Sequence, residues 1–161
     1  VVDADVDYKK LIERSPIEDF SQYAYDQKDR NAFKKLMWLK SDYNSERKEF
    51  ERVAKHFKLD TKKFKLQYEN SKIQKFSKSL WSKLENTDSW DVSTIEDVDE
   101  IAHKYGRNYK KILVEMSATM HKTYCPIVVH HKNKYHLVAG KTRLMICRAM
   151  EVDPMVVIVD M

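Results

Sequence analysis

The chain has 161 residues, of which 42% are hydrophobic and 11% aromatic, so it can form one hydrophobic core and no more than two small modules. Its 2 glycines and 3 prolines exclude collagen-like and linker-like chains and disfavour all-β folds, which need frequent turn residues. No apolar run is long enough to span a membrane, and the first residues lack the features of a signal peptide. We therefore expect a helix-rich, cytoplasmic protein without a membrane partner.

The formal net charge of +5 is distributed unevenly along the chain. Residues 34–83 carry 15 basic and 6 acidic side chains, whereas residues 84–101 carry 7 acidic side chains and no basic one. Residues 102–161 are basic again, with 10 basic and 4 acidic side chains. Two positive blocks separated by an acidic segment favour an anionic partner.

The first positive block has the composition of a nucleic-acid surface, because it combines charge with aromatic rings that can stack on bases. Its aromatic residues include Tyr43, Phe64, Tyr68 and Trp81. Its only arginines are Arg47 and Arg52, and the other basic residues are lysines. The block therefore predicts at most a sequence-independent attraction to DNA, and its alternative is a set of solvated lysine faces on amphipathic helices.

Residues 19–84 show apolar positions that recur every three or four residues, which predicts a small bundle of amphipathic helices. The stripes are Phe33, Leu36 and Met37; Phe50, Val53, Ala54 and Phe57; and Ile73, Phe76, Leu80 and Leu84. A polar, acidic stretch at 86–92 is the best candidate for a boundary. Ser93 to Glu96 then fits a capping box, which begins a helix that Gly106 ends, and a further helix is expected from Tyr109 to Met120.

After Pro126 the pattern changes from helical to β. Residues 127–129 and 137–139 predict two neighbouring strands around a polar turn, and residues 141–151 predict a helix. Residues 155–159 form a continuous apolar run, typical of a strand buried on both faces.

The expected fold class is therefore α/β (α+β), a small mixed sheet with packed helices. We expect this sheet in a domain at residues 89–161. A helical, lysine-rich region at residues 1–88 precedes it and either caps the sheet or forms its own lobe.

The residues most informative about chemistry follow the second predicted strand. Gly140 permits a tight turn and the close approach of a ligand. The first N–H groups of the next helix have no partner within the helix, so they form an anion site, with Lys141, Thr142 and Arg143 beside them. A Walker A loop is excluded because it needs glycine where this chain has Tyr135. The alternative is a glycine turn before a solvated basic helix start.

Histidines and cysteines give weaker signals. His136 alternates with apolar neighbours, so it is a candidate ligand for the same phosphate, with a buried core histidine as the alternative. His130 and His131 point to opposite sides of a strand and cannot chelate one metal, so no metal site is predicted. Cys125 and Cys147 lie in apolar surroundings, which suits a reducing compartment.

The segment from Pro126 to Asp160 resembles the ParB/sulfiredoxin superfamily, and within it the short ParB-like proteins common in bacteriophages. Gly140 and Arg143 match the G-x-x-R of the superfamily, and Pro126 and Pro154 match the prolines that precede two of its strands. With the helices from Ser93 included, the resemblance still leaves the N-terminal half uncovered.

The resemblance implies a phosphate or nucleotide site at residues 140–143, with ATP or CTP and Mg²⁺ as candidate ligands. Relatives use this pocket for CTP binding, for ATP-dependent repair of sulfinic acid, for phosphoryl transfer, or for ATPase and DNase activity. Lys141 stands where sulfiredoxins have cysteine, so sulfinic acid repair is not expected. The acidic residue of the G-E-R-R box of partition proteins is also missing here.

A carboxylate that binds a metal or acts as a general base would have to come from outside this loop. Glu115 on the preceding predicted helix and Asp160 at the end of the last strand are the candidates, and the alternative for both is a solvated surface residue.

Two hypotheses about function remain. One is a nucleotide-dependent enzyme or switch, performing NTP hydrolysis, phosphoryl transfer or DNA cleavage. The other is a non-catalytic module that binds DNA or an acidic protein surface through the loop and the basic helices.

Overall fold

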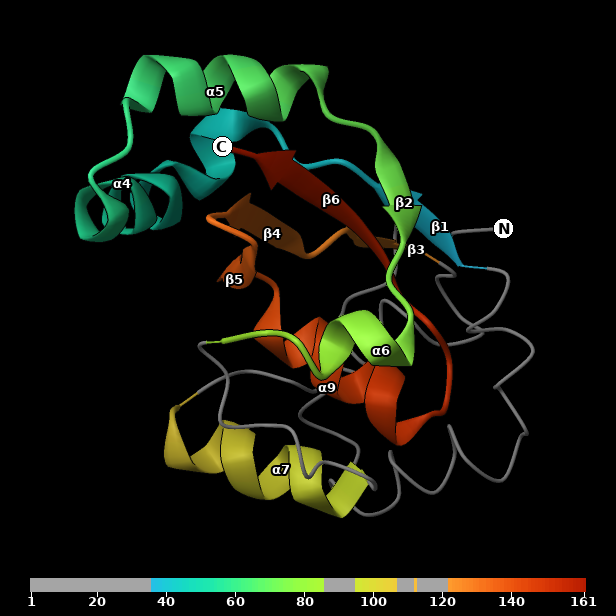
Figure 1. Ribbon diagram of the computed structural model, residues 1–161. Helices are drawn as coiled ribbons and strands as arrows, with labels where there is room; N and C mark the ends of the chain where they lie inside the picture. Colours follow the sequence, from blue (N-terminus) through green and yellow to red (C-terminus); the bar gives the residue numbers. More distant parts are fainter. Residues whose placement is uncertain (1–35, 86–94, 107–111, 113–121) are drawn as a thin grey trace, which may run out of the picture. The chain divides into compact units, whose positions relative to one another are not determined.

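The computed structural model describes residues 36–85, 95–106, 112 and 122–161 (Figure 1). The chain forms two compact units. Of the described residues, one unit, here called the sheet unit, holds 38–85, 124–141 and 154–161, and the second unit holds 36–37, 95–106, 112, 122–123 and 142–153. Described residues from both sides of the predicted boundary at residues 88/89 thus contribute to the sheet unit. The division into two consecutive domains stays a prediction.

The sheet unit is built on a four-stranded mixed sheet with the strand order β2-β6-β4-β5. The strands are β2 (Ile73–Lys75), β4 (Ile127–His131), β5 (Lys134–Ala139) and β6 (Met155–Asp160). β4 pairs antiparallel with β5 and parallel with β6, which pairs antiparallel with β2 (Figure 1). The expected mixed sheet with packed helices is confirmed. Val156 and Val157, on opposite faces of β6, are both 0% exposed, so this strand is buried on both faces as predicted.

Two helices of the lysine-rich region cover one face of this sheet (Figure 1). They are α4 (Arg47–Phe57), which follows the short 3₁₀ helix η1 (Tyr43–Glu46), and α5 (Thr61–Asn70). The residues that form this core are Phe50, Val53, Ala54, Phe64, Tyr68, Cys125, Ile127, Val129, Val138, Val157 and Val159. The described helices α4 and α5 therefore cap the sheet and do not form a lobe of their own.

The third predicted helical stripe is wrong at its start, because Ile73 lies in strand β2. β2 pairs with β6, and Phe76 N–H continues the contact by donating to the carbonyl of Pro154 at 2.8 Å. A strand edge offers unpaired backbone groups, and this non-local pairing outweighs the local helical spacing. Of the helix predicted from this stripe, the structure contains only the short helix α6 (Lys78–Trp81). Leu84, the last residue of the stripe, forms a parallel bridge with Tyr135 at the other edge of the sheet.

The second unit contains α7 (Ile95–Lys104) and most of α9 (Lys141–Ala149). α7 ends before Gly106, whose φ is +64°, so the predicted helix and its stop are confirmed. Residues 93 and 94 of the predicted capping box lie outside the described residues. So does the helix predicted at 109–120, except for Ile112.

A two-stranded sheet that the sequence patterns did not predict joins β1 (Met37–Leu39) to β3 (Lys122–Tyr124). The first predicted helical stripe is therefore wrong at Met37, which is exposed on β1, whereas Leu36 is buried and Phe33 lies outside the described residues. Within the described part of the chain, every helix is too short or too polar to cross a membrane.

Gly140 makes the turn from β5 into α9 and lies against Pro126. Its φ is +97°, and a Cβ atom placed on it would lie 2.6 Å from Cα and 2.8 Å from Cβ of Pro126. Both the backbone conformation and the contact therefore require glycine here.

We predict that Gly140→Ala destabilises the protein by about 3 kcal/mol or more, because left-handed strain adds to a clash with backbone. Gly106→Ala is the matched control, since Gly106 also has positive φ but, its chain neighbours aside, no atom of the described residues lies within 4 Å of its Cβ position. That variant should lose only about 1–2 kcal/mol. Urea unfolding of both variants measures the difference, and equal losses would contradict the role given to the Pro126 contact.

Candidate functional site

The junction between β5 and α9 has the arrangement that the sequence predicts. β5 ends at Ala139, Gly140 makes the turn, and α9 begins at Lys141. The first turn of α9 contains Lys141 and Arg143 and no acidic residue. Since the first N–H groups of a helix lack partners within the helix and carry partial positive charge, this turn favours an anion.

Arg143 is held in place by a neighbouring hydroxyl within the second unit. Its Nε donates a hydrogen bond to Oγ1 of the buried Thr123 on β3 at 3.0 Å. Lys141 and Arg143 are both half-buried, whereas the side chain of Thr142 is buried. The hydroxyl of Thr142 is therefore not presented to a ligand from solvent.

The structure changes the reason for glycine at position 140. The sequence leads us to expect that a ligand approaches Gly140 closely, but Pro126 fills the space beside it. Gly140 therefore sets the direction of the chain into α9 and does not itself admit a phosphate. Two of the residues that carry the family resemblance thus contact each other directly.

His136, the other predicted phosphate ligand, lies in the core of the sheet unit. It is 8% exposed, and its ring centroid is 4.2 Å from that of Phe57 on α4. Burial lowers the pKa of His136, and nearby His131, Lys134 and His56 lower it further, against the opposing effect of Glu85. The side chain is thus a neutral ring packed beneath α4, an environment that suits a core histidine better than a phosphate ligand.

The structure does not bring Asp160, one of the two predicted carboxylates, to the loop. Ala139, next to the loop, pairs with Ile127 at the start of β4, whereas Asp160 pairs with His130 near the end of that strand. Three residues along a strand span about 10 Å, so Asp160 lies at the opposite end of the sheet. Glu115 lies outside the described residues. A role for Asp160 beside the loop, as metal ligand or general base, is therefore not supported by its position.

The described residues also contain no cluster of three or more His, Cys, Asp or Glu side chains that could hold a metal ion.

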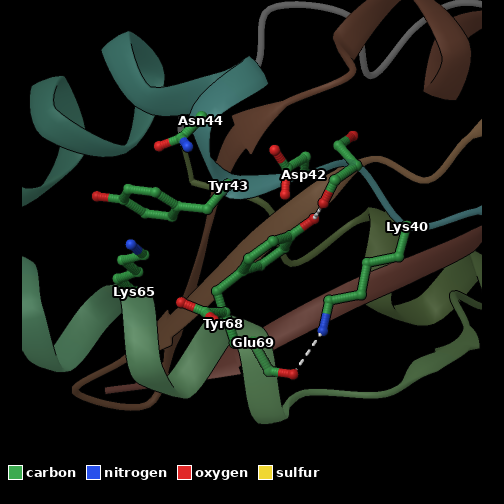
Figure 2. Close-up of a pocket in the computed structure, with 8 residues that line it drawn as sticks. Lys40, Asp42, Tyr43, Asn44, Lys65, Tyr68 and Glu69 are labelled. Carbon is green, nitrogen blue, oxygen red and sulfur yellow. Dashed lines mark hydrogen bonds between the residues drawn. The ribbon is translucent and has the colours of Figure 1, made fainter.

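An open pocket of about 470 Å³ lies between η1 and α5, and the sequence patterns did not predict it. Figure 2 shows Tyr43 and Lys65 at one side, Lys40 at the other and Tyr68 between them. Lys40 Nζ donates to the carbonyls of Glu69 at 3.1 Å and Ser71 at 2.8 Å, so this cation caps the end of α5. The pocket was missed because it joins segments more than twenty residues apart, and no local motif marks it.

The lysine-rich region presents its charge on the solvent side of α4 and α5. The exposed lysines of these helices and of the turn between them are Lys48, Lys55, Lys58, Lys62, Lys63 and Lys65. The two arginines of the region are engaged by glutamates of their own helix, Arg47 by Glu51 and Arg52 by Glu49, each at 2.8 Å. Lysines therefore provide the charge that this surface offers to a partner.

The prediction that four aromatic rings of this region stack on bases is wrong for three of them. Phe64, Tyr68 and Trp81 are buried, and the first two pack against Phe50. The hydroxyl of Tyr68 donates to the carbonyl of Ser41 at 2.5 Å, and burial raises the pKa of this phenol. Only Tyr43 is partly accessible. The spacing of these aromatic residues therefore indicates core positions and not a surface that stacks on bases.

We predict that the position of His136 makes stability depend on pH. At about pH 7.5, well above the ordinary pKa of about 6.5, the ring is neutral in the folded and the unfolded chain, and no stability is lost. Below that pH the unfolded chain binds the proton more readily, because the folded pKa is lowered, so the folded state loses stability. Denaturant unfolding between about pH 7.5 and 5 should show this loss, and a smaller one in His136→Gln. An identical pH dependence in the variant would contradict it.

In comparisons with protein-family models, curated proteins and solved structures, none matched this chain.

Proposed function

We propose that this protein is a ParB-like nucleotide-binding protein, in which the first turn of α9 binds the phosphate groups. One observation carries the proposal: a strand ends at a glycine turn and a helix begins with two cationic and no acidic side chains. The first N–H groups of a helix have no partner within the helix, and they lie at the positive end of its dipole. The resemblance to the ParB/sulfiredoxin superfamily, drawn from Gly140 and Arg143, supports the same assignment.

Arg143 is the residue on which affinity should depend most. A charge-assisted hydrogen bond contributes about 1.5–3 kcal/mol, compared with about 0.3–1 kcal/mol for an anion at an exposed helix terminus. The bond from its Nε to Thr123 restricts the guanidinium before a ligand arrives, which lowers the entropy lost on binding. Lys141 adds a second, less directional charge.

The proposal is limited to binding. ATP and CTP are the nucleotides that the resemblance favours, and NTP hydrolysis, phosphoryl transfer and DNA cleavage are the reactions that it associates with this loop. Each of these reactions needs a group that activates water or a nucleophile. Since Asp160 lies at the other end of the sheet, we assign that role to none of the residues that the structure describes.

Thermal unfolding with ATP, ADP, CTP and GTP, each with and without Mg²⁺, tests the proposal. A nucleotide at 100 times its Kd should add about 2.7 kcal/mol and raise the Tm by several degrees. We predict that Arg143→Ala abolishes this shift and that Arg148→Ala, in the last turn of the same helix, preserves it. No shift with any nucleotide, or an equal shift in Arg143→Ala, would refute the assignment.

A second function is favoured by a separate observation, the exposed lysines of α4 and α5. We propose that this surface attracts the backbone of a nucleic acid without reading its sequence, because lysines neutralise phosphates but lack the bidentate geometry of arginine. This function does not require the first turn of α9, so the two proposals can be tested separately.

For this second proposal, the double variant Lys62→Gln/Lys63→Gln should lower the slope of log K against log salt by up to about 2, since each phosphate contact on B-DNA contributes about 0.9. Lys104→Gln on α7 removes a charge outside the surface and should leave the slope unchanged. Titration of duplex DNA at several salt concentrations measures the slopes. Equal affinity at about 50 and 300 mM salt would exclude the electrostatic surface.

A further inference from the structure

His130 and Asp160 form a polar pair at the end of the sheet away from α9. Nδ1 of His130 lies 3.0 Å from Oδ1 of Asp160, and the two residues are partners in the register of β4 and β6. The His130 side chain is 31% exposed and that of Asp160 is 81% exposed. The imidazole is thus held by a carboxylate and remains accessible to a small molecule.

A third side chain fixes the plane of the imidazole. Tyr135 faces His130 across the β4–β5 hairpin, and their rings stack with centroids 4.5 Å apart and planes inclined by 16°. The backbone nearby is also tied, since Met161 N–H donates to the carbonyl of His130 at 2.9 Å. Two neighbouring strands therefore position the ring.

This geometry determines which nitrogen can react. A carboxylate beside Nδ1 favours the tautomer with its proton on Nδ1, which leaves the lone pair on Nε2. The same carboxylate stabilises the positive charge that develops when Nε2 forms a bond. Nε2 of His130 therefore has the arrangement of an activated nucleophile.

The surroundings favour an anionic reagent. The hairpin turn directly after His131 places exposed Lys132 and Lys134 in the chain next to the pair, and positive φ at Lys132 and Asn133 gives the tight two-residue turn. Nearby lysines raise the local concentration of phosphates.

We propose that Nε2 of His130 accepts a phosphoryl group from a reactive donor of the acyl phosphate class, with Asp160 as its positioning residue. The lone pair of Nε2 attacks phosphorus, an N–P bond forms, and the P–O bond to the acyl group breaks as carboxylate leaves with the electron pair. The proton on Nδ1 stays in the hydrogen bond to Asp160. The inference does not depend on phosphate binding at α9.

The test is to incubate the full chain with acetyl phosphate and to identify acid-labile phosphate by intact mass and peptide mapping, with ³¹P NMR to assign the nitrogen. We expect the phosphate on Nε2 of His130 and none after His130→Gln. Asp160→Asn, which keeps the size and removes the charge, should slow phosphorylation about tenfold or more, because the imidazole loses a charge-assisted hydrogen bond in the transition state. His131→Gln is the matched control and should react like the unaltered protein.

The unaltered protein alone can refute the proposal, whatever the variants do to folding. Phosphate spread equally over exposed histidines such as His56 and His103, or absent from His130, would overturn it. An unchanged rate in Asp160→Asn would show that the pair is only a surface ion pair, which contributes little to stability and nothing to reactivity.

Discussion

The sheet unit depends on the position of Pro126, where three segments of the chain meet. The carbonyl of Pro126 accepts a hydrogen bond from Val157 N–H at 3.0 Å, which aligns the start of β6 with β4. Its ring fills the space beside Gly140, which directs the chain from β5 into α9. One residue thus sets the register of the parallel pair and the turn that precedes the candidate phosphate site. Because a side chain at position 140 would collide with it, the two residues constrain each other.

The two ends of the sheet carry different functional groups. At the end marked by Ile127 and Ala139, the chain turns into a helix whose first turn is cationic. At the other end, strand pairing brings His130 beside Asp160 and Tyr135. We propose phosphate binding at the first end, because a helix start combines N–H groups with positive charge. The second suits bond formation to phosphorus, since it offers a positioned nitrogen lone pair. Phosphate binding at α9 and phosphoryl transfer to His130 therefore concern separate sites, and each can be tested without the other.

The sequence predicted the C-terminal strands and helix α9 well because their signals are local. Branched apolar runs, a polar turn and a glycine before the helix each act within a few residues. β2 could not be predicted in this way: Ile73 and Phe76 have helical spacing, and only the free edge of β6 makes a strand there. The same limit applies to side chains. The spacing of Phe64 and Tyr68 is compatible with a stacking surface and with a core. They are buried because they pack against the sheet.

In the candidate site, too, local geometry could be predicted and contacts between distant segments could not. The junction of Gly140 with Lys141 and Arg143 is contiguous, so its strand-turn-helix geometry could be predicted. Asp160 and His136 could not be placed, since their neighbours come from strand register and from α4. Asp160, which we expected near the loop, is instead a partner of His130.

Phosphate binding by the first turn of α9 is tested most directly by following backbone amide resonances of ¹⁵N-labelled protein during titration with ATP or CTP. The account predicts that the largest, saturable shifts belong to Lys141, Thr142 and Arg143, because their N–H groups would donate to the phosphate. Shifts confined to the lysines of α4 and α5, or no saturable shift at these three amides, would contradict it.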